Sequence, residues 1–159
     1  MSAVVFISLG SNLGDRAHNL AQAALALPPD VKVVAASPIY QTEPWGFAGQ
    51  GAFLNQVLQV ETDLEPEKLL GYLKNIEVEM GRLPTFRYGP RLIDIDILLY
   101  NALVLSSQSL TIPHLHLHKR AFVLVPLAFL APHLRHPVLG RTVTELLGQV
   151  DTEGIAVFG

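Results

Sequence analysis

Apolar positions recur along the chain with two spacings, and segments of the two kinds follow one another. Segments rich in β-branched residues predict strands, in which successive side chains point to opposite faces. Segments with apolar residues at i, i+3, i+4 and i+7 predict helices with one apolar face. These patterns place strands at residues 3–9, 31–37 with a continuation to residue 40, 52–61 and 92–100, and helices at residues 15–27 and 66–80.

Prolines and glycines mark where these elements end. Pro28-Pro29 stops the first helix, and Gly81 ends the second. Pro66 stands in the first turn of the second helix, where the missing N–H costs nothing. The segments 42–51 and 82–90 each hold several glycines or prolines and predict loops.

The elements follow the order strand–helix–strand twice, which predicts a ferredoxin-like α+β fold, an α/β/α sandwich with a mainly antiparallel central sheet. The remainder is made of shorter pieces: a hairpin near residues 103–112, a helix around residues 125–131, and a capping box at residues 142–145 that opens a last helical turn. We find no internal repeat and no low-complexity linker in the 159 residues. A single domain over residues 1–159 is therefore expected.

Composition narrows the function classes. Half of the residues are hydrophobic and 16% are charged, which is typical of a folded chain. The net charge of −3 argues against an extended nucleic-acid-binding face, and the absence of cysteine excludes disulfides and thiolate metal sites. The N-terminus lacks a basic region and a cleavage site, and the longest apolar stretch, residues 121–132, is too short to span a bilayer. We expect a cytoplasmic monomer that binds neither membranes nor nucleic acids.

Two carboxylates interrupt the otherwise apolar strand at residues 92–100. Asp94 and Asp96 are two residues apart, so they point to the same face, roughly 6–7 Å from each other at Cα. Such a pair can hold hard divalent cations such as Mg²⁺, which bind carboxylate and phosphate oxygens. An amphipathic strand with one wet face, or aspartates paired with nearby arginines, is the structural alternative.

Three arginines precede this pair within a dozen residues. Arg82, Arg87 and Arg91 lie in or next to the loop expected at residues 82–90. Guanidinium groups bind phosphate, so the combination suits a nucleoside triphosphate with its metal ions. Charge compensation of two aspartates does not by itself explain three arginines.

Five regions of the chain carry recognisable motifs: SLGSNLGD at residues 8–15, YQTEPWG at 40–46 with FLN at 53–55, RYGPRLIDIDIL at 87–98, LTIPH at 110–114 and RAF at 120–122. Together they resemble the 6-hydroxymethyl-7,8-dihydropterin pyrophosphokinase family of folate biosynthesis. The resemblance implies a ferredoxin-like α/β/α sandwich. It also implies transfer of the β,γ-diphosphoryl group of ATP to the hydroxymethyl group of the pterin, with release of AMP and with two Mg²⁺ ions.

The resemblance assigns the chemical step to four residues. Asp94 and Asp96 would hold both metal ions, which bridge the phosphates of ATP. Arg82 and Arg91 match phosphate-contacting positions on or beside the mobile loop of the family. Catalysis would then consist mostly of positioning and charge neutralisation.

The same resemblance implies a pterin site. Phe53 and Phe122 match the two aromatic positions that sandwich the pterin, although ordinary core packing is the alternative for either ring. Asn55 both donates and accepts hydrogen bonds, as the amide-like edge of a pterin requires. The neighbouring loop would add wall and backbone contacts from Thr42, Pro44 and Trp45.

Further residues match positions beside the nucleotide: Lys74, Glu77, Ile97, Thr111, His114 and Arg120. Glu77 lies off the apolar stripe of its helix. The resemblance implies that it supports the arginine loop or the metal site, and a solvated glutamate is the alternative. The chain departs from the family pattern at Leu115, Lys74 and Pro84. These departures bear on nucleotide affinity and loop kinetics.

Two other functions remain open from the sequence. If residues 114–118 formed a strand, His114, His116 and His118 would share one face and could bind zinc in a hydrolase. The neighbouring Lys119-Arg120 disfavours a second cation there. A non-catalytic ferredoxin-like module, for example one that binds RNA, is the second alternative, and the negative net charge argues against it.

Overall fold

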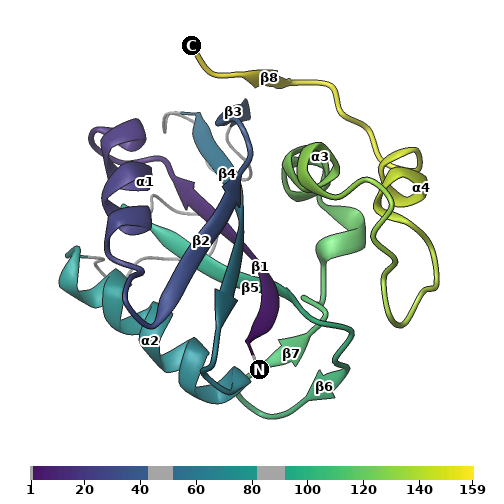
Figure 1. Cartoon of the computed structure of the whole chain (residues 1–159). Helices are drawn as coiled ribbons and strands as arrows, with labels where there is room; N and C mark the ends of the chain where they lie inside the picture. The colour runs from purple at the N-terminus through teal and green to yellow at the C-terminus, as the bar shows by residue number, and fades with distance from the viewer. Residues whose placement is uncertain (1, 43–51, 82–91) are drawn as a thin grey trace.

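A computed structural model describes residues 2–42, 52–81 and 92–159 (Figure 1). Its elements are, in chain order, β1 (Ala3–Ser11), α1 (Arg16–Leu25), β2 (Val31–Ala36), β3 (Tyr40–Thr42), β4 (Phe53–Thr62), α2 (Pro66–Glu79), β5 (Asp94–Tyr100), β6 (Leu105–Ser106), β7 (Thr111–Ile112), a 3-10 turn (Leu117–Lys119), α3 (Ala121–Leu130), α4 (Val143–Leu147) and β8 (Ile155–Val157). Among these residues no helix is long and apolar enough to cross a membrane.

The central sheet has the strand order β5-β1-β4-β3-β8, and β2 pairs with β4 as well. Every pairing that the described strands make in this sheet is antiparallel. The chain forms two halves, β1-α1-β2 and β4-α2-β5. The first strand of the first half, β1, lies beside the last strand of the second half, β5. This arrangement confirms the ferredoxin-like prediction, in which the two halves share one antiparallel sheet.

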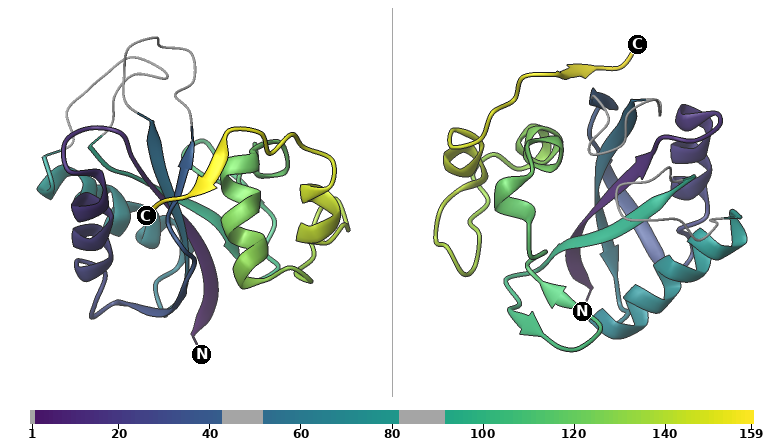
Figure 2. Two further views of the ribbon diagram at one scale, coloured as in Figure 1. Left: turned by 90° about the horizontal axis from the view of Figure 1, so that it is seen from above. Right: turned by 180° about the vertical axis from the view of Figure 1, so that it is seen from behind.

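Helices cover both faces of the sheet. In Figures 1 and 2, α1 and α2 lie on one face, and α3 and α4 lie on the other. Each face has its own apolar cluster: Ile95 packs with Leu20 of α1 and Leu73 of α2, whereas Leu98 packs with Leu124 of α3. The cavity described below lies on the face of the sheet that α3 covers.

Local sequence determines the helix ends as expected. The Asp15 carboxylate accepts the backbone N–H of His18 at 3.2 Å and so caps α1. At α4, Thr142 and Glu145 form the predicted capping box. Pro66 opens α2, and Gly81, just beyond its end, has a φ of +87°, which glycine adopts without strain.

The second predicted strand is wrong in its extent, because the structure divides it. β2 ends at Ala36 and β3 begins only at Tyr40. The side chain of Ser37 accepts the backbone N–H of Val57 at 3.0 Å, so that a hydroxyl takes the place of a carbonyl in the pairing with β4. Pro38, which follows, has no N–H to donate. The chain therefore bends between the two strands.

Other boundaries also differ from the prediction by a few residues. β5 begins at Asp94 rather than at residue 92, and α3 begins at Ala121 rather than near residue 125. α3 is apolar almost all round its circumference, so no apolar stripe marks its start. The predicted hairpin is confirmed as β6 and β7, whereas the loops predicted at 42–51 and 82–90 lie almost entirely outside the described residues.

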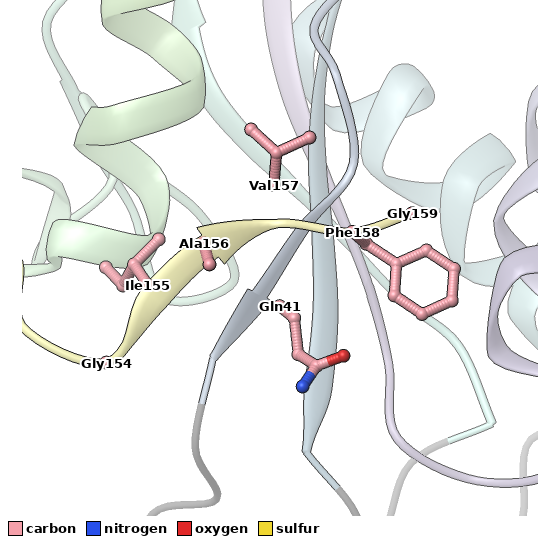
Figure 3. Close-up of a pocket in the computed structure, with 7 residues that line it drawn as sticks. All are labelled: Gln41, Gly154, Ile155, Ala156, Val157, Phe158 and Gly159. Atoms are coloured by element: carbon pink, nitrogen blue, oxygen red, sulfur yellow. The ribbon is translucent and has the colours of Figure 1, made fainter.

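The C-terminal strand β8 was not predicted. It pairs with β3 at the edge of the sheet, and the Phe158 N–H donates to the Ile39 carbonyl at 2.8 Å. The Arg16 guanidinium lies over the Phe158 ring, 5.8 Å from its centroid. A hollow of about 480 Å³ lies beside this strand. Figure 3 shows the residues that line it, Gln41 and residues 154–159. None of its lining side chains ionises, so we assign it no chemistry.

Candidate active site

One row of residues crosses three adjacent strands on the α3 face of the sheet. Gly10 of β1 is paired with Asn55 of β4 on one side and with Asp94 of β5 on the other. Ser8, two residues earlier, is paired with Asp96. Residues directly opposite each other point to the same face, and neighbouring strands are about 4.8 Å apart. The row therefore places Asn55 and Asp94 roughly 10 Å apart at Cα.

Gly10 leaves space at the centre of this row. A Cβ atom at this position would lie 3.1 Å from Asn55 Oδ1 and 3.9 Å from the Phe53 ring. A side chain at this position would therefore crowd the Asn55 amide, which would have to shift by a few tenths of an ångström. The gap also leaves an open path over the sheet between Asn55 and Asp94.

A cavity of about 660 Å³ lies over this row, within the size range of sites for small molecules. Eight of the residues assigned from the sequence to the pterin, metal and nucleotide sites line it: Thr42, Phe53, Asn55, Asp94, Asp96, His114, Arg120 and Phe122. They come from β3, β4, β5, the segment after β7 and the start of α3. The structure thus brings the predicted pterin, metal and nucleotide residues around one cavity.

The cavity also has walls to which the sequence analysis assigned no role in binding the pterin or the nucleotide. Ser8, Gly10 and Leu98 form part of the sheet side, and His116 and Lys119 add a basic rim. The C-terminal segment contributes Val150, Asp151, Glu153 and Ile155. The SLGS motif could have identified Ser8 and Gly10, which alternate on one strand face. No local pattern identifies the C-terminal residues, because β8 has only three residues.

The carboxylate pair has the arrangement that alternation predicts. Asp94 and Asp96 are half-buried and line the cavity, whereas Ile95 is fully buried on the opposite face. In the described part of the chain, no group of three or more His, Cys, Asp and Glu side chains is arranged to hold a metal ion. Two carboxylates alone suit Mg²⁺, which keeps waters and takes further oxygens from a phosphate substrate. The donor set therefore fits magnesium held together with a nucleotide.

The zinc-triad alternative is not supported. Residues 114–118 form a bend that leads into a 3-10 turn, not a strand, so their imidazoles do not share one face. The His114 and His116 rings are 6.2 Å apart, edge to face, while the His118 ring packs against His136 at 6.3 Å. His116 lines the cavity.

His114 faces the carboxylate pair as a neutral hydrogen-bond donor. Burial lowers its pKa most, and the positive charges of Arg120, His116 and Lys74 lower it further, against the opposing effect of Asp96. Its Nδ1 accepts the backbone N–H of His116 at 3.2 Å. The neutral ring therefore carries its proton on Nε2, which is free of that bond and can donate to a phosphate oxygen.

Arg120 and Phe122 are linked at the start of α3. The Arg120 guanidinium lies over the Phe122 ring, 5.6 Å from its centroid. A cation–π contact of this kind holds both side chains in position at the cavity wall. The arrangement places a phosphate-binding cation next to an aromatic ring that a planar ligand can stack on.

Four predicted residues lie away from the cavity lining. Thr111 belongs to the small β6–β7 sheet, and Lys74 lies on α2 beside Glu77. The Ile97 side chain is 3% exposed in the core below β5, which leaves its backbone as the part that could contact a nucleotide. Glu77 is also 3% exposed, so the alternative of a solvated glutamate is wrong.

Other predicted residues lie outside the described part of the chain. These are Pro44, Trp45, Pro84, Arg82, Arg87 and Arg91. Leu115, a departure from the family pattern, is 62% exposed and does not line the cavity.

Comparison with known proteins gives a consistent result. The model of the family described as 7,8-dihydro-6-hydroxymethylpterin-pyrophosphokinase (HPPK) matches residues 6–132. A 2-amino-4-hydroxy-6-hydroxymethyldihydropteridine pyrophosphokinase of Methylorubrum extorquens is 45% identical over 152 residues, which cover 94% of this chain and 95% of the relative. The folic acid synthesis protein fol1 of Schizosaccharomyces pombe is 42% identical over 98% of this chain, but the match covers only 21% of that longer protein.

A solved structure supports the fold. The Plasmodium falciparum HPPK-DHPS crystal structure superposes with a TM-score of 0.75 at 16% identity over 94% of this chain. The match covers 45% of the Plasmodium chain, so this chain spans less than half of that protein.

Proposed function

The chain belongs to the 7,8-dihydro-6-hydroxymethylpterin-pyrophosphokinase family, and we propose that the cavity between the sheet and α3 is its active site. The enzyme transfers diphosphate from ATP to 6-hydroxymethyl-7,8-dihydropterin in folate biosynthesis, giving AMP and the dihydropterin diphosphate. It is a magnesium-dependent transferase that acts on small molecules.

The row Asn55–Gly10–Asp94 carries the assignment of the site. At one end the cavity offers an amide and aromatic rings, which suit a flat heterocycle, and at the other it offers carboxylates, an imidazole and a guanidinium, which suit a metal-bound triphosphate. The two ends are roughly 10 Å apart at Cα, across a residue that has no side chain. A pterin at one end and a triphosphate at the other would bring the hydroxymethyl group and the β-phosphate together above Gly10.

The pterin end works by stacking and hydrogen bonding. Phe53 and Phe122 contact the two faces of the pterin ring, and the Asn55 amide forms hydrogen bonds with its edge. Asn55 is held in place because its Nδ2 contacts Thr42 Oγ1 at 3.5 Å and its Oδ1 lies against β1. The adjoining loop adds Pro44 and Trp45.

The triphosphate end works by charge. Asp94 and Asp96 would hold two Mg²⁺ ions, which when bound neutralise the phosphates and lower the pKa of the acceptor hydroxyl. The chain itself positions the phosphates: His114 donates from Nε2, and Arg120 supplies a guanidinium. Further cationic and nucleotide contacts are assigned to Arg82, Arg91, Lys74, Thr111 and the Ile97 backbone.

We further propose that the chain works as one cytoplasmic, monomeric domain over residues 1–159. Its C-terminal segment is paired with the sheet and lines the cavity, which supports a single unit.

Product analysis tests the function. Purified protein with ATP and Mg²⁺ should release AMP only when 6-hydroxymethyl-7,8-dihydropterin is present, with one dihydropterin diphosphate formed for each AMP. Release of ADP, or AMP formation that does not depend on the pterin, would contradict the proposal. Omission of Mg²⁺ is the matched control.

A further inference from the structure

Glu77 makes a contact that sequence reasoning did not foresee. This residue of α2 is 3% exposed, and its Oε2 accepts the backbone N–H of Ile95 at 2.7 Å. Lys74 Nζ approaches the same oxygen at 3.3 Å and the Ile95 carbonyl at 3.5 Å. Ile95 is the residue between Asp94 and Asp96, so one buried carboxylate binds the backbone between the two proposed metal ligands.

The position of β5 explains why such a contact is needed. β5 is at the edge of the sheet formed by the described strands and pairs there with β1 alone. Half of the backbone N–H groups of an edge strand point away from its neighbour and find no partner in the ladder. A buried N–H without a partner is costly, and a carboxylate is a stronger acceptor than a carbonyl. Glu77 thus supplies the acceptor that a neighbouring strand would otherwise offer to the Ile95 N–H.

We propose that Glu77 is a positioning residue for magnesium and ATP, acting through the Ile95 backbone to hold Asp94 and Asp96 in place. It is not among the residues that line the cavity and so acts without touching the substrates. This inference rests on the proposed function of the carboxylate pair. Residues that orient metal ligands typically change metal affinity by 10- to 100-fold when they are mutated.

Two conservative variants separate position from charge. Glu77→Gln keeps the length of the side chain and an acceptor oxygen but removes the charge, whereas Glu77→Asp keeps the charge and withdraws the acceptor by one methylene. Glu79→Asp is the matched control, because Glu79 lies on the same helix, is exposed and bonds to Asn75. Two readouts are needed: amide hydrogen exchange of Ile95 in the metal-free protein, and the Mg²⁺ concentration that half-saturates binding of a non-hydrolysable ATP analogue.

We expect Glu77→Asp to speed Ile95 exchange and to raise the Mg²⁺ midpoint by about tenfold or more, with pterin affinity unchanged. Glu77→Gln should protect Ile95 as the wild type does and should shift the midpoint by less than about threefold, and Glu79→Asp should change neither readout. The inference is overturned if Glu77→Gln raises the midpoint as much as Glu77→Asp, or if neither variant raises it.

The proposed function can fail separately. If the wild type binds no ATP analogue with Mg²⁺, the function of the cavity is wrong. If the wild type binds it and the midpoint is indifferent to Glu77, only the positioning role is wrong.

Discussion

Removing one carboxylate of the pair should separate activity from stability. Asp96→Asn keeps the size of the side chain and removes the charge of a residue whose Cα lies roughly 6.5 Å from that of Asp94, as two residues of strand rise imply. Coulomb repulsion at that distance is about 0.6 kcal/mol in bulk water and about 2.5 kcal/mol at an effective dielectric constant of 20. Relief of this repulsion stabilises the fold.

The free energy of unfolding of the metal-free protein should therefore stay unchanged or rise by at most about 2.5 kcal/mol. Each kcal/mol corresponds to a rise in Tm of about 2–4 °C for a chain of this size. Turnover should instead fall by about 10³-fold, or about 4 kcal/mol of transition-state stabilisation, because the metal ions lose a shared ligand.

Two measurements check this: initial rates of AMP formation with saturating Mg²⁺, and thermal unfolding without Mg²⁺ or nucleotide. Asp63→Asn is the control, because Asp63 is exposed on the surface and its carboxylate accepts a bond from Ser2. It should change neither quantity by much. Near-normal turnover of Asp96→Asn would refute the reasoning, and so would a loss of stability of more than about 2 kcal/mol, which would make Asp96 a structural residue.

Three other predictions concern the pterin end and the supporting structure. Phe53→Ala should weaken pterin binding by about tenfold or more and leave binding of an ATP analogue nearly unchanged, measured by calorimetry; equal losses for both ligands would contradict the assignment. The pKa of His136 is lowered in the folded state, mainly by burial and also by His118. The unfolded state therefore binds a proton at His136 more strongly than the folded state does. The free energy of unfolding should therefore fall as the pH drops below about 6.5. Urea unfolding at pH 7 and at pH 5 should show a smaller loss of this free energy for His136→Gln than for the wild type. The control His133→Gln, at an exposed residue, should lose as much as the wild type. Thr142→Ala removes the capping box of α4 and should cost about 0.5–2 kcal/mol in urea unfolding with unchanged turnover; no cost would mean that the cap contributes nothing.

Local periodicity was sufficient for the parts of the site that lie within one strand. Asp94 and Asp96 share a face because alternation along a strand is a property of the sequence itself, and Phe53 and Asn55 share a face of β4 for the same reason. The ferredoxin-like topology also followed, because the order of strands and helices limits how they can pair.

Contacts between strands and helices could not be predicted in the same way. The row Asn55–Gly10–Asp94 depends on the register of three strands, and no single segment contains that information. The position of Glu77 off the apolar stripe of α2 left a solvated glutamate open as an alternative, and only the edge position of β5 shows why a carboxylate is buried there. The C-terminal wall of the cavity depends on a strand of three residues, too short to leave a pattern.

The account depends most on Asp94 and Asp96 gathering metal ions around a triphosphate. Crystals grown with Mn²⁺ in place of Mg²⁺, a non-hydrolysable ATP analogue and the pterin allow the cations to be located by their anomalous scattering. We predict two peaks, each within bonding distance of the Asp94 or Asp96 carboxylate and of a phosphate oxygen. Phosphates bound with no cation between them and these two carboxylates would contradict the account.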